Sequence, residues 1–460
     1  MMLGVHVCLA LAVTAAWSNA PRAHHVSMRT RPAVMSAADR PSGADVSTAA
    51  VTADNPTESV PPLADSKPVA ESQPPAESEP VADTLADFKA AAEKANVPSG
   101  PKAELMAGLR REYGSFFQPM EDNLYNPAVT FEDPLIALSG VDAYKNNVNM
   151  LAGKTLMGML CFSDCGLNMH NLTETADGGL ESRWTLQFRF KLLPWQPVAR
   201  FTGVSRYTLD DSCRVLRQQD YWDSINLNRG KYAPVEKSEA LKDLLGQLAP
   251  GGVGSAQQSS DKELPYELLR RAKPRGGLPG YEVRRYPQHV SVATEYYRRI
   301  EAFGTLGAYT NGANEASLEL KAYVPSLVSV PYDKRTLSQI NNDALDLKPP
   351  EVTKTMRWPL AVPAMKEPAP PKPTGRLEGF AELNLMPSRT VAVLAFADPT
   401  TEPNVRGFHG LLESYLKEDG LKPAEGEQEE QFRLAQFDAL NSLGARRSEI
   451  WIDLADDNPW

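Results

Sequence analysis

Cys161, Cys165 and His170 come nearest to a metal-binding pattern in this sequence. A tetrahedral zinc site takes four cysteine or histidine ligands, most often as two closely spaced pairs. No second cysteine pair and no nearby histidine pair completes the set. The other two cysteines are Cys8 and Cys213. Four cysteines in a chain of this length are too few for a disulfide-stapled scaffold. We therefore expect these thiols to be ordinary core residues.

The sequence also lacks the short motifs that mark many enzymes. It has neither a nucleophile elbow nor a phosphate-binding loop. Its 58 acidic and 48 basic residues leave a formal charge of -10, and no basic run reverses that sign locally. Such a charge repels nucleic acid and anionic membrane surfaces. We therefore predict a protein that is not an enzyme and does not bind nucleic acid.

The first 86 residues are expected to direct and tether the chain rather than to fold. Residues 3–16 form an apolar stretch that suits a signal peptide and is too short to span a bilayer, so residues 1–16 are predicted to be a signal peptide and no transmembrane anchor is expected. Residues 17–40 carry four arginines against one acidic residue, which is typical of a transit peptide. Residues 41–86 are rich in proline and acidic residues, which predicts a disordered linker.

This order of segments resembles the bipartite presequence of algae with complex plastids, which implies import into the chloroplast. Simple secretion is the alternative. The two differ in their consequence for Asn171-Leu172-Thr173, a glycosylation acceptor pattern that matters only in a secreted protein.

A first folded unit is expected over residues 87–234. Apolar residues at helical spacing predict a helix over residues 103–117, which Pro119 ends. Alternating side chains then predict strands at residues 181–192, 201–209 and 215–225. In the first of these, Arg183 is expected on the wet face. A helix followed by a curved antiparallel sheet predicts an α+β cone whose mouth can hold a small molecule.

Residues 125–151 and 183–197 resemble an uncharacterised domain of plastid proteins that is similar in fold to nuclear transport factor 2. Relatives of that fold include isomerases with an acidic base in the cone, which makes Asp133, Asp220 and Asp223 candidates for a general base. Because Asp133 precedes Pro134, we expect its side chain to close a turn instead.

A second folded unit is expected over residues 278–455, after a linker with a short helix at residues 235–277. Its predicted strands are residues 281–296 with a break at Pro287, 316–330, 356–362 and 388–397. Its predicted helices are residues 405–418 and 429–440. The class is again α+β.

This second unit resembles the SOUL haem-binding family along nearly its whole length. The matching blocks are YEVRRY (281–286), AFGTLGAYTNGANE (302–315), MRWPLAVPAM (356–365), LMPSRTVAVLAFAD (385–398) and SEIWIDL (448–454). Residues 435–440 and Val324-Pro325 depart from the family pattern, and these changes bear on ligand affinity rather than on fold. The resemblance implies a distorted antiparallel β-barrel flanked by helices.

The resemblance also implies a non-covalently bound haem or a metal-free porphyrin. Such a ligand is a flat apolar plate with two propionates, so it needs aromatic walls and cations at its rim. The candidate residues are His289 as the axial metal ligand, Arg284, Arg285, Arg298, Arg299 and Arg335 as rim cations, and Tyr286 and Trp358 as aromatic walls. Because His289 differs in parity from Val290 and Val292, its side chain is expected to face outward.

The leading prediction is therefore a plastid protein whose second unit binds a tetrapyrrole as a carrier or buffer. One alternative is an enzyme that uses the cone of the first unit near Asp133 or Asp220. The other is a scaffold that dimerises through the open sheet of the first unit, with no part for haem.

Overall fold

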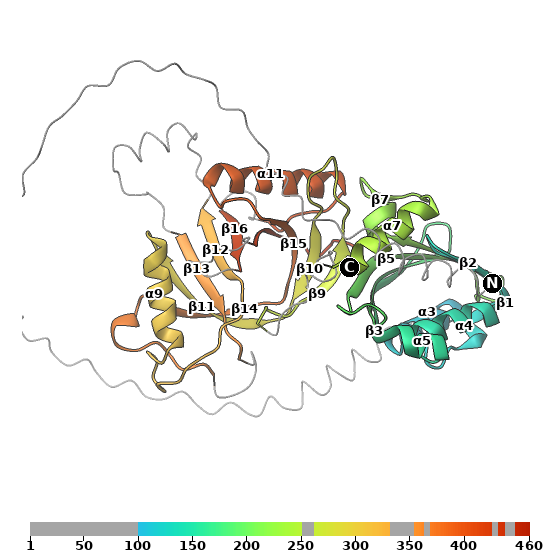
Figure 1. Ribbon diagram of the computed structural model, residues 1–460, viewed down its shortest axis with the longest axis horizontal. Helices are drawn as coiled ribbons and strands as arrows, with labels where there is room; N and C mark the ends of the chain where they lie inside the picture. The colour runs from blue at the N-terminus through green and yellow to red at the C-terminus, as the bar shows by residue number, and fades with distance from the viewer. Residues whose placement is uncertain (1–99, 251–261, 332–353, 363–368, 426–430, 438–446) are drawn as a thin grey trace, which may run out of the picture. The chain divides into compact units, whose positions relative to one another are not determined.

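The computed structural model describes residues 100–250, 262–331, 354–362, 369–425, 431–437 and 447–460 (Figure 1). The predicted signal peptide, transit peptide and acidic linker lie outside these ranges, as does Arg335. Within them, two sheets are each covered by helices on one face, which confirms the α+β class. No helix in these ranges is both long and apolar enough to cross a membrane.

The first unit opens with helix α3 (Pro101–Gly114), close to the predicted helix. Proline suits the first turn of a helix because that turn has no partner for a backbone N–H. Two more helices, α4 (Val141–Leu151) and α5 (Leu156–Cys161), complete the layer. Leu105, Leu109 and Tyr113 of α3 are buried in the core that these helices form with the sheet.

The six strands of this unit lie in the order β2-β1-β6-β5-β4-β3. Their bounds are β1 (Tyr125–Glu132), β2 (Ala137–Ser139), β3 (Phe162–Glu174), β4 (Leu180–Phe190), β5 (Val198–Leu209) and β6 (Val215–Trp222). All neighbours are antiparallel except β1 and β6. The predicted helix and the three predicted strands are confirmed.

The expectation of a wet face on β4 is wrong at Arg183, which is only 5% exposed. Its guanidinium Nη1 donates to the carbonyl of Leu269, 3.2 Å away, so strand β9 (Glu267–Arg271) covers it. After β6 the chain forms the short helix α6 (Asp223–Asn226), the hairpin of β7 (Leu227–Asn228) and β8 (Lys231–Tyr232), and helix α7 (Lys237–Leu248).

The second unit is one antiparallel sheet in the order β14-β11-β13-β12-β16-β17-β15-β10-β9. Its further strands are β10 (Glu282–Tyr286), β11 (His289–Tyr296), β12 (Ser326–Pro331), β13 (Lys354–Pro359), β14 (Glu382–Met386), β15 (Arg389–Phe396), β16 (Gln431–Gln436) and β17 (Ser448–Asp453). Helices α9 (Arg299–Thr310) and α11 (Glu402–Glu418) pack on one face of it (Figure 1).

This sheet must curl strongly. Strands β10 and β11 are joined by only Pro287 and Gln288, yet they are eighth and second in the order of strands. Two residues span too short a distance to cross a flat sheet, so the two ends of the sheet approach one another. The edge strands β14 and β9 are not paired with each other in the described residues. The predicted barrel is thus a curled sheet that hydrogen bonds do not close.

Two local predictions for this unit are corrected. Residues 429–440 were expected to be helical, but Gln431–Gln436 is strand β16, paired with β12 and β17. Pairing on both sides outweighs a weak helical preference. The strand expected over residues 316–330 begins only at Ser326. Helix α11 confirms the helix that was predicted at residues 405–418.

Candidate functional site

The strand register divides the predicted ligand residues between two faces of the nine-stranded sheet. Residues that pair across neighbouring strands share a face. His289 therefore lies on the same face as Arg284 and Tyr286. The pairs that connect them run from β10 through β15, β17, β16, β12 and β13 to β11. We call this face the inner face. Trp358 pairs with Val292 on the opposite face, which lies under α9 and α11 and which we call the helix face.

Arg284 is bound into a buried ion-pair network on the inner face and is not at a solvated rim. It is 1% exposed, and its guanidinium donates to Glu282 at 2.8 Å and to Glu449 at 3.1 Å. Burial alone would raise the pKa of Glu282, but Arg284 and Arg271 overcome it and lower that pKa to about 2. The donors of Arg284 are therefore engaged by carboxylates of the chain itself.

Tyr286 belongs to the packing of the inner face. Its ring stacks on Trp451 with a centroid distance of 4.6 Å, and it is fully buried. Sequence reasoning did not single out Trp451 or Glu449. Glu449 could have been found from the sequence, because it is an acidic residue inside the apolar run of residues 448–454. A buried strand carries a charged side chain only when that charge is paired.

His289 also lies inside, so the expectation of an outward side chain is wrong. Strand β11 is buried on both faces, and His289 is 4% exposed. Its Nδ1 donates to the carbonyl of Pro287 at 2.9 Å, which leaves the lone pair on Nε2. In the described residues Nε2 is buried without a hydrogen-bond partner. Burial also lowers the pKa of His289, which keeps the ring neutral. Iron ligation by His289 stays a prediction.

Trp358 and Arg299 both contact Phe303 of α9, and Arg298 immediately precedes Arg299 at the start of that helix. The Trp358 ring meets Phe303 of α9 edge-on at 5.6 Å, and the Arg299 guanidinium lies 5.2 Å from the centre of the Phe303 ring. The Arg298 side chain is 80% exposed, and among the described residues it pairs with Glu301 at 2.7 Å. Exposed pairs of this kind contribute little stability.

Apolar side chains extend this surface. Ile300 in the first turn of α9 is 67% exposed, and Leu385 on edge strand β14, which pairs with β11, is 58% exposed. Leu385 pairs with Val290 and so lies on the helix face. The helix face and the start of α9 thus carry aromatic, aliphatic and cationic side chains.

The remaining predicted cation is placed elsewhere. Arg285 pairs with Glu267 of β9 at 3.0 Å. It therefore joins neither His289 on the inner face nor the arginines beside α9.

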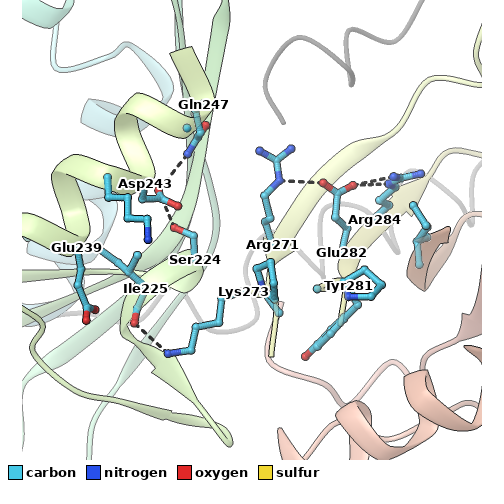
Figure 2. Close-up of a pocket in the computed structure, with 18 residues that line it drawn as sticks. Ser224, Ile225, Glu239, Asp243, Gln247, Arg271, Lys273, Tyr281, Glu282 and Arg284 are labelled. Carbon is cyan, nitrogen blue, oxygen red and sulfur yellow. Dashed lines mark hydrogen bonds and ion pairs between the residues drawn. The ribbon is translucent and has the colours of Figure 1, made fainter. Parts of the chain in front are cut away.

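A cavity of about 740 Å³ lies between helix α7 and strands β9, β10 and β15 (Figure 2). Its charged lining is largely paired, since Glu282 accepts from Arg271 at 2.9 Å and from Arg284. Lys273 points across it toward the carbonyl of Ile225 at 3.5 Å (Figure 2). Sequence reasoning did not foresee this cavity because segments far apart in the chain line it.

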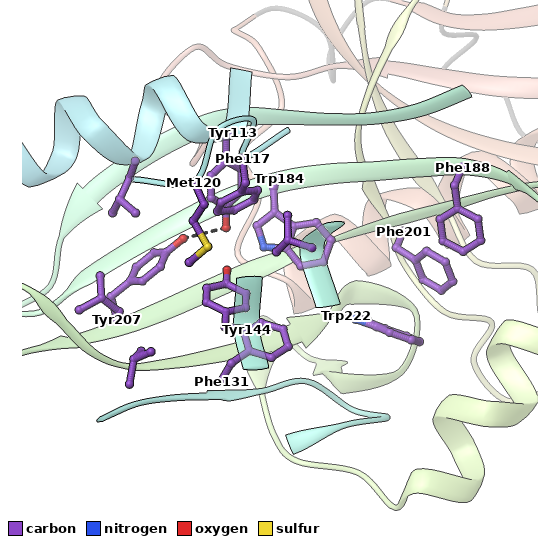
Figure 3. Close-up of a cluster of buried hydrophobic side chains, with 14 of the residues drawn as sticks. Tyr113, Phe117, Met120, Phe131, Tyr144, Trp184, Phe188, Phe201, Tyr207 and Trp222 are labelled. Atoms are coloured by element: carbon purple, nitrogen blue, oxygen red, sulfur yellow. Dashed lines mark hydrogen bonds between the residues drawn. The ribbon is translucent and has the colours of Figure 1, made fainter. Parts of the chain in front are cut away.

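The cone of the first unit holds a smaller cavity of about 90 Å³. Seven aromatic residues line it, namely Tyr113, Phe116, Phe117, Phe131, Tyr144, Trp184 and Trp222. Figure 3 shows these rings apart from Phe116. Asp133 from the end of β1 and Asp220 from β6 line the same cavity. The structure thus brings together two of the three carboxylates that the sequence singled out.

Both carboxylates are oriented by neutral donors. Asp133 Oδ1 accepts from the backbone N–H groups of Leu135 and Ile136, each at 2.7 Å, which confirms the predicted turn. Asp220 accepts from the amide of Gln218 at 3.0 Å. Burial raises the pKa of Asp133 to about 6 and that of Asp220 to about 7.

Asp223 has a different place. It is fully buried, accepts from Arg183 at 3.0 Å and from Thr202 at 2.6 Å, and does not line the aromatic cavity. It neutralises the buried Arg183 guanidinium.

Cys161, Cys165 and Cys213 are free thiols. His170 bonds Thr185 at 2.8 Å and lies 3.1 Å from Glu267. Within the described ranges, no three residues of the kinds His, Cys, Asp and Glu gather in a way that could hold a metal ion.

The fold and these sites define an α+β protein in which an aromatic cone precedes a curled antiparallel sheet. Residues 261–453 match the family model described as "SOUL heme-binding protein", and residues 103–218 match the one described as "Uncharacterized conserved protein (DUF2358)". Both resemblances drawn from the sequence are thereby confirmed. No curated protein matches this sequence.

Solved structures are similar to parts of the chain. An NTF2-like protein of unknown function from Exiguobacterium sp. 255-15 is 16% identical, with 25% of this chain and 98% of that chain covered and a TM-score of 0.20. A steroid delta-isomerase from Pseudomonas aeruginosa is 15% identical, with 33% and 95% covered and a TM-score of 0.22. The EcmrR C-terminal domain is 12% identical, with 38% and 96% covered and a TM-score of 0.27.

Proposed function

We propose that this protein binds haem or a related tetrapyrrole through residues 261–453 and serves as a carrier or buffer for it in the plastid. The observation that carries the proposal is the match of this region to the SOUL haem-binding family. The helix face supports it, because Trp358 and Phe303 meet there and the Arg299 guanidinium lies over the Phe303 ring, directly after Arg298 in the chain.

These residues fit the ligand. Aromatic and aliphatic side chains would contact the macrocycle, and two guanidinium groups at the start of α9 would bind the propionates. Such binding leaves the iron without a named protein ligand. His289, whose Nε2 carries a buried lone pair, would coordinate the iron only if the haem entered the inner face.

The test is a titration of the full chain with haem, followed by absorption. A shifted Soret band with saturation at micromolar ligand is the expected result. An unchanged band throughout the titration would remove the proposal. Repeating the titration with metal-free protoporphyrin, followed by fluorescence, shows whether binding requires iron.

A second candidate function is catalysis in the cone of the first unit. The observation that favours it is the placement of Asp133 and Asp220 in one cavity, each with its pKa raised toward neutrality. A carboxylate with such a pKa is suited to accept a proton near pH 7. This candidate fails if the protein isolated from cells carries no small molecule and if Asp220→Asn does not change the binding of small molecules in the cone.

A further inference from the structure

The proposed tetrapyrrole site does not include the aromatic cavity of the first unit, whose lining has a definite chemical character. Rings from α3, α4, β1, β4 and β6 surround about 90 Å³ of space (Figure 3). Asp133 and Asp220 line the same space. The faces of aromatic rings carry partial negative charge, so they attract cations.

The ring arrangement is fixed by packing. Tyr144 stacks on Phe131 at a centroid distance of 4.8 Å and meets Phe117 edge-on at 6.1 Å. The Tyr144 hydroxyl donates to Gln218 at 3.0 Å, and Gln218 in turn donates to Asp220 at 3.0 Å. Tyr144 of the wall and the Asp220 carboxylate are therefore joined through Gln218 by hydrogen bonds, and ring contacts hold the neighbouring phenylalanines, so the site is shaped before a ligand arrives.

The charge of the cavity is not balanced by a neighbouring cation of the described chain. Asp220 is held by Gln218, and Asp133 by two backbone N–H groups. The one described cation that acts on Asp133 is Lys237, whose own side chain is exposed to solvent. A buried carboxylate without a counterion is costly, and a cationic ligand removes that cost.

We propose that this cavity binds a small organic cation, an alkylated ammonium group, between its aromatic rings and the carboxylates of Asp133 and Asp220. A methylated ammonium group has no strong hydrogen-bond donor. Aromatic ring faces therefore bind it better than water-exposed hydrogen-bond acceptors do. The size of the cavity restricts the buried part to the ammonium group itself. This inference does not rest on haem binding, and its test uses no haem.

The experiment compares choline with 3,3-dimethylbutan-1-ol, its uncharged carbon analogue of the same shape, on the full chain. Calorimetry measures both affinities, and proton NMR follows the methyl signals. Choline is expected to bind at least tenfold more tightly, and its N-methyl signals are expected to shift upfield because ring currents shield a group that aromatic rings enclose.

Asp220→Asn should weaken choline binding at least tenfold, whereas Asp211→Asn, in an exposed turn, should leave it unchanged. If Asp220→Asn does not fold, Asp133→Asn and Phe131→Leu replace it. The leucine removes a ring but keeps apolar volume, and it should weaken choline binding more than binding of the alcohol. Equal affinity for choline and the alcohol, no binding of choline, or methyl signals without an upfield shift would each overturn the proposal.

Discussion

His289 and Trp358 lie on opposite faces of the same sheet, although the strands that carry them are neighbours. Trp358 pairs with Val292 of β11, and three positions separate Val292 from His289, so the pleat turns the two side chains apart. One flat ligand cannot touch both without disrupting the sheet. Substituting His289 and Trp358 one at a time therefore shows which face of the sheet binds a tetrapyrrole.

If the helix face binds haem, Trp358→Ala should weaken haem binding by about tenfold, since a large aromatic contact contributes on the order of 1–3 kcal/mol. His289→Ala should leave both affinity and Soret position unchanged. Titration of each variant gives the comparison. A Soret band that changes in His289→Ala but not in Trp358→Ala would move the ligand to the inner face.

A related prediction concerns Arg298 and Arg299 at the start of α9. Arg298→Ala should weaken haem binding severalfold and make it less sensitive to salt, because an ion pair with a propionate is lost. Lys273→Ala, which changes the larger cavity (Figure 2), is the matched control and should bind as the unmodified protein does. Weaker binding in Lys273→Ala alone would instead place the ligand in that cavity.

The network around Arg284 is expected to dominate stability in the second unit. Arg284→Met leaves Glu449 and Glu282 buried with less compensation, so it should lower the free energy of unfolding by about 3–5 kcal/mol. Arg298→Met, on an exposed side chain, should change it by less than about 0.5 kcal/mol. Urea unfolding followed by circular dichroism measures both. Equal, small effects would contradict the burial of the network.

The carboxyl group of Asp220 predicts a pH dependence of stability. Its pKa is about 7 in the folded protein, above that of an unfolded chain, so the folded state holds the proton at pH values where the unfolded state has lost it. Its contribution to stability is therefore present at low pH and is lost as pH rises toward and through 7. Relative to the unmodified protein, Asp220→Asn should gain stability between pH 5 and pH 8.

Urea midpoints of both proteins at the two pH values test this, with Asp211→Asn as the control that should track the unmodified protein. Glu112, whose pKa burial likewise raises to about 7, adds a similar slope to all three proteins and cancels in the comparison. A gain by Asp220→Asn at pH 5 rather than pH 8 would show that the carboxyl group is ionised when folded.

Two glycines should respond in opposite ways to alanine. In β5, a Cβ on Gly203 would lie 2.1 Å from the carbonyl oxygen of Tyr221 and 3.0 Å from the Trp184 ring, so Gly203→Ala should destabilise the first unit by about 3 kcal/mol or more. Gly246 in helix α7 has open space around it, and Gly246→Ala should stabilise by about 0.5–1 kcal/mol. Thermal unfolding distinguishes the two signs.

Patterns within a few residues of the chain were enough to predict much of the fold. The spacing of Leu105, Leu109 and Tyr113 marked α3, and the alternation around Trp184 marked β4, because the periods of helix and strand fix which side chains share a face. The block-wise resemblance identified both matched regions. The turn at Asp133 was also predictable, since an aspartate before proline bonds its own backbone.

Only the tertiary structure decided what each face meets. Parity showed that His289 and Val290 point apart, but not that β11 is buried on both sides, and Arg183 was expected in water because nothing local announces that β9 covers it. Strand β16 was misread as helix because its pairing partners are distant in sequence. Asp133 and Asp220 share one cavity for the same reason, since contacts between remote segments depend on how whole elements pack and not on local periodicity.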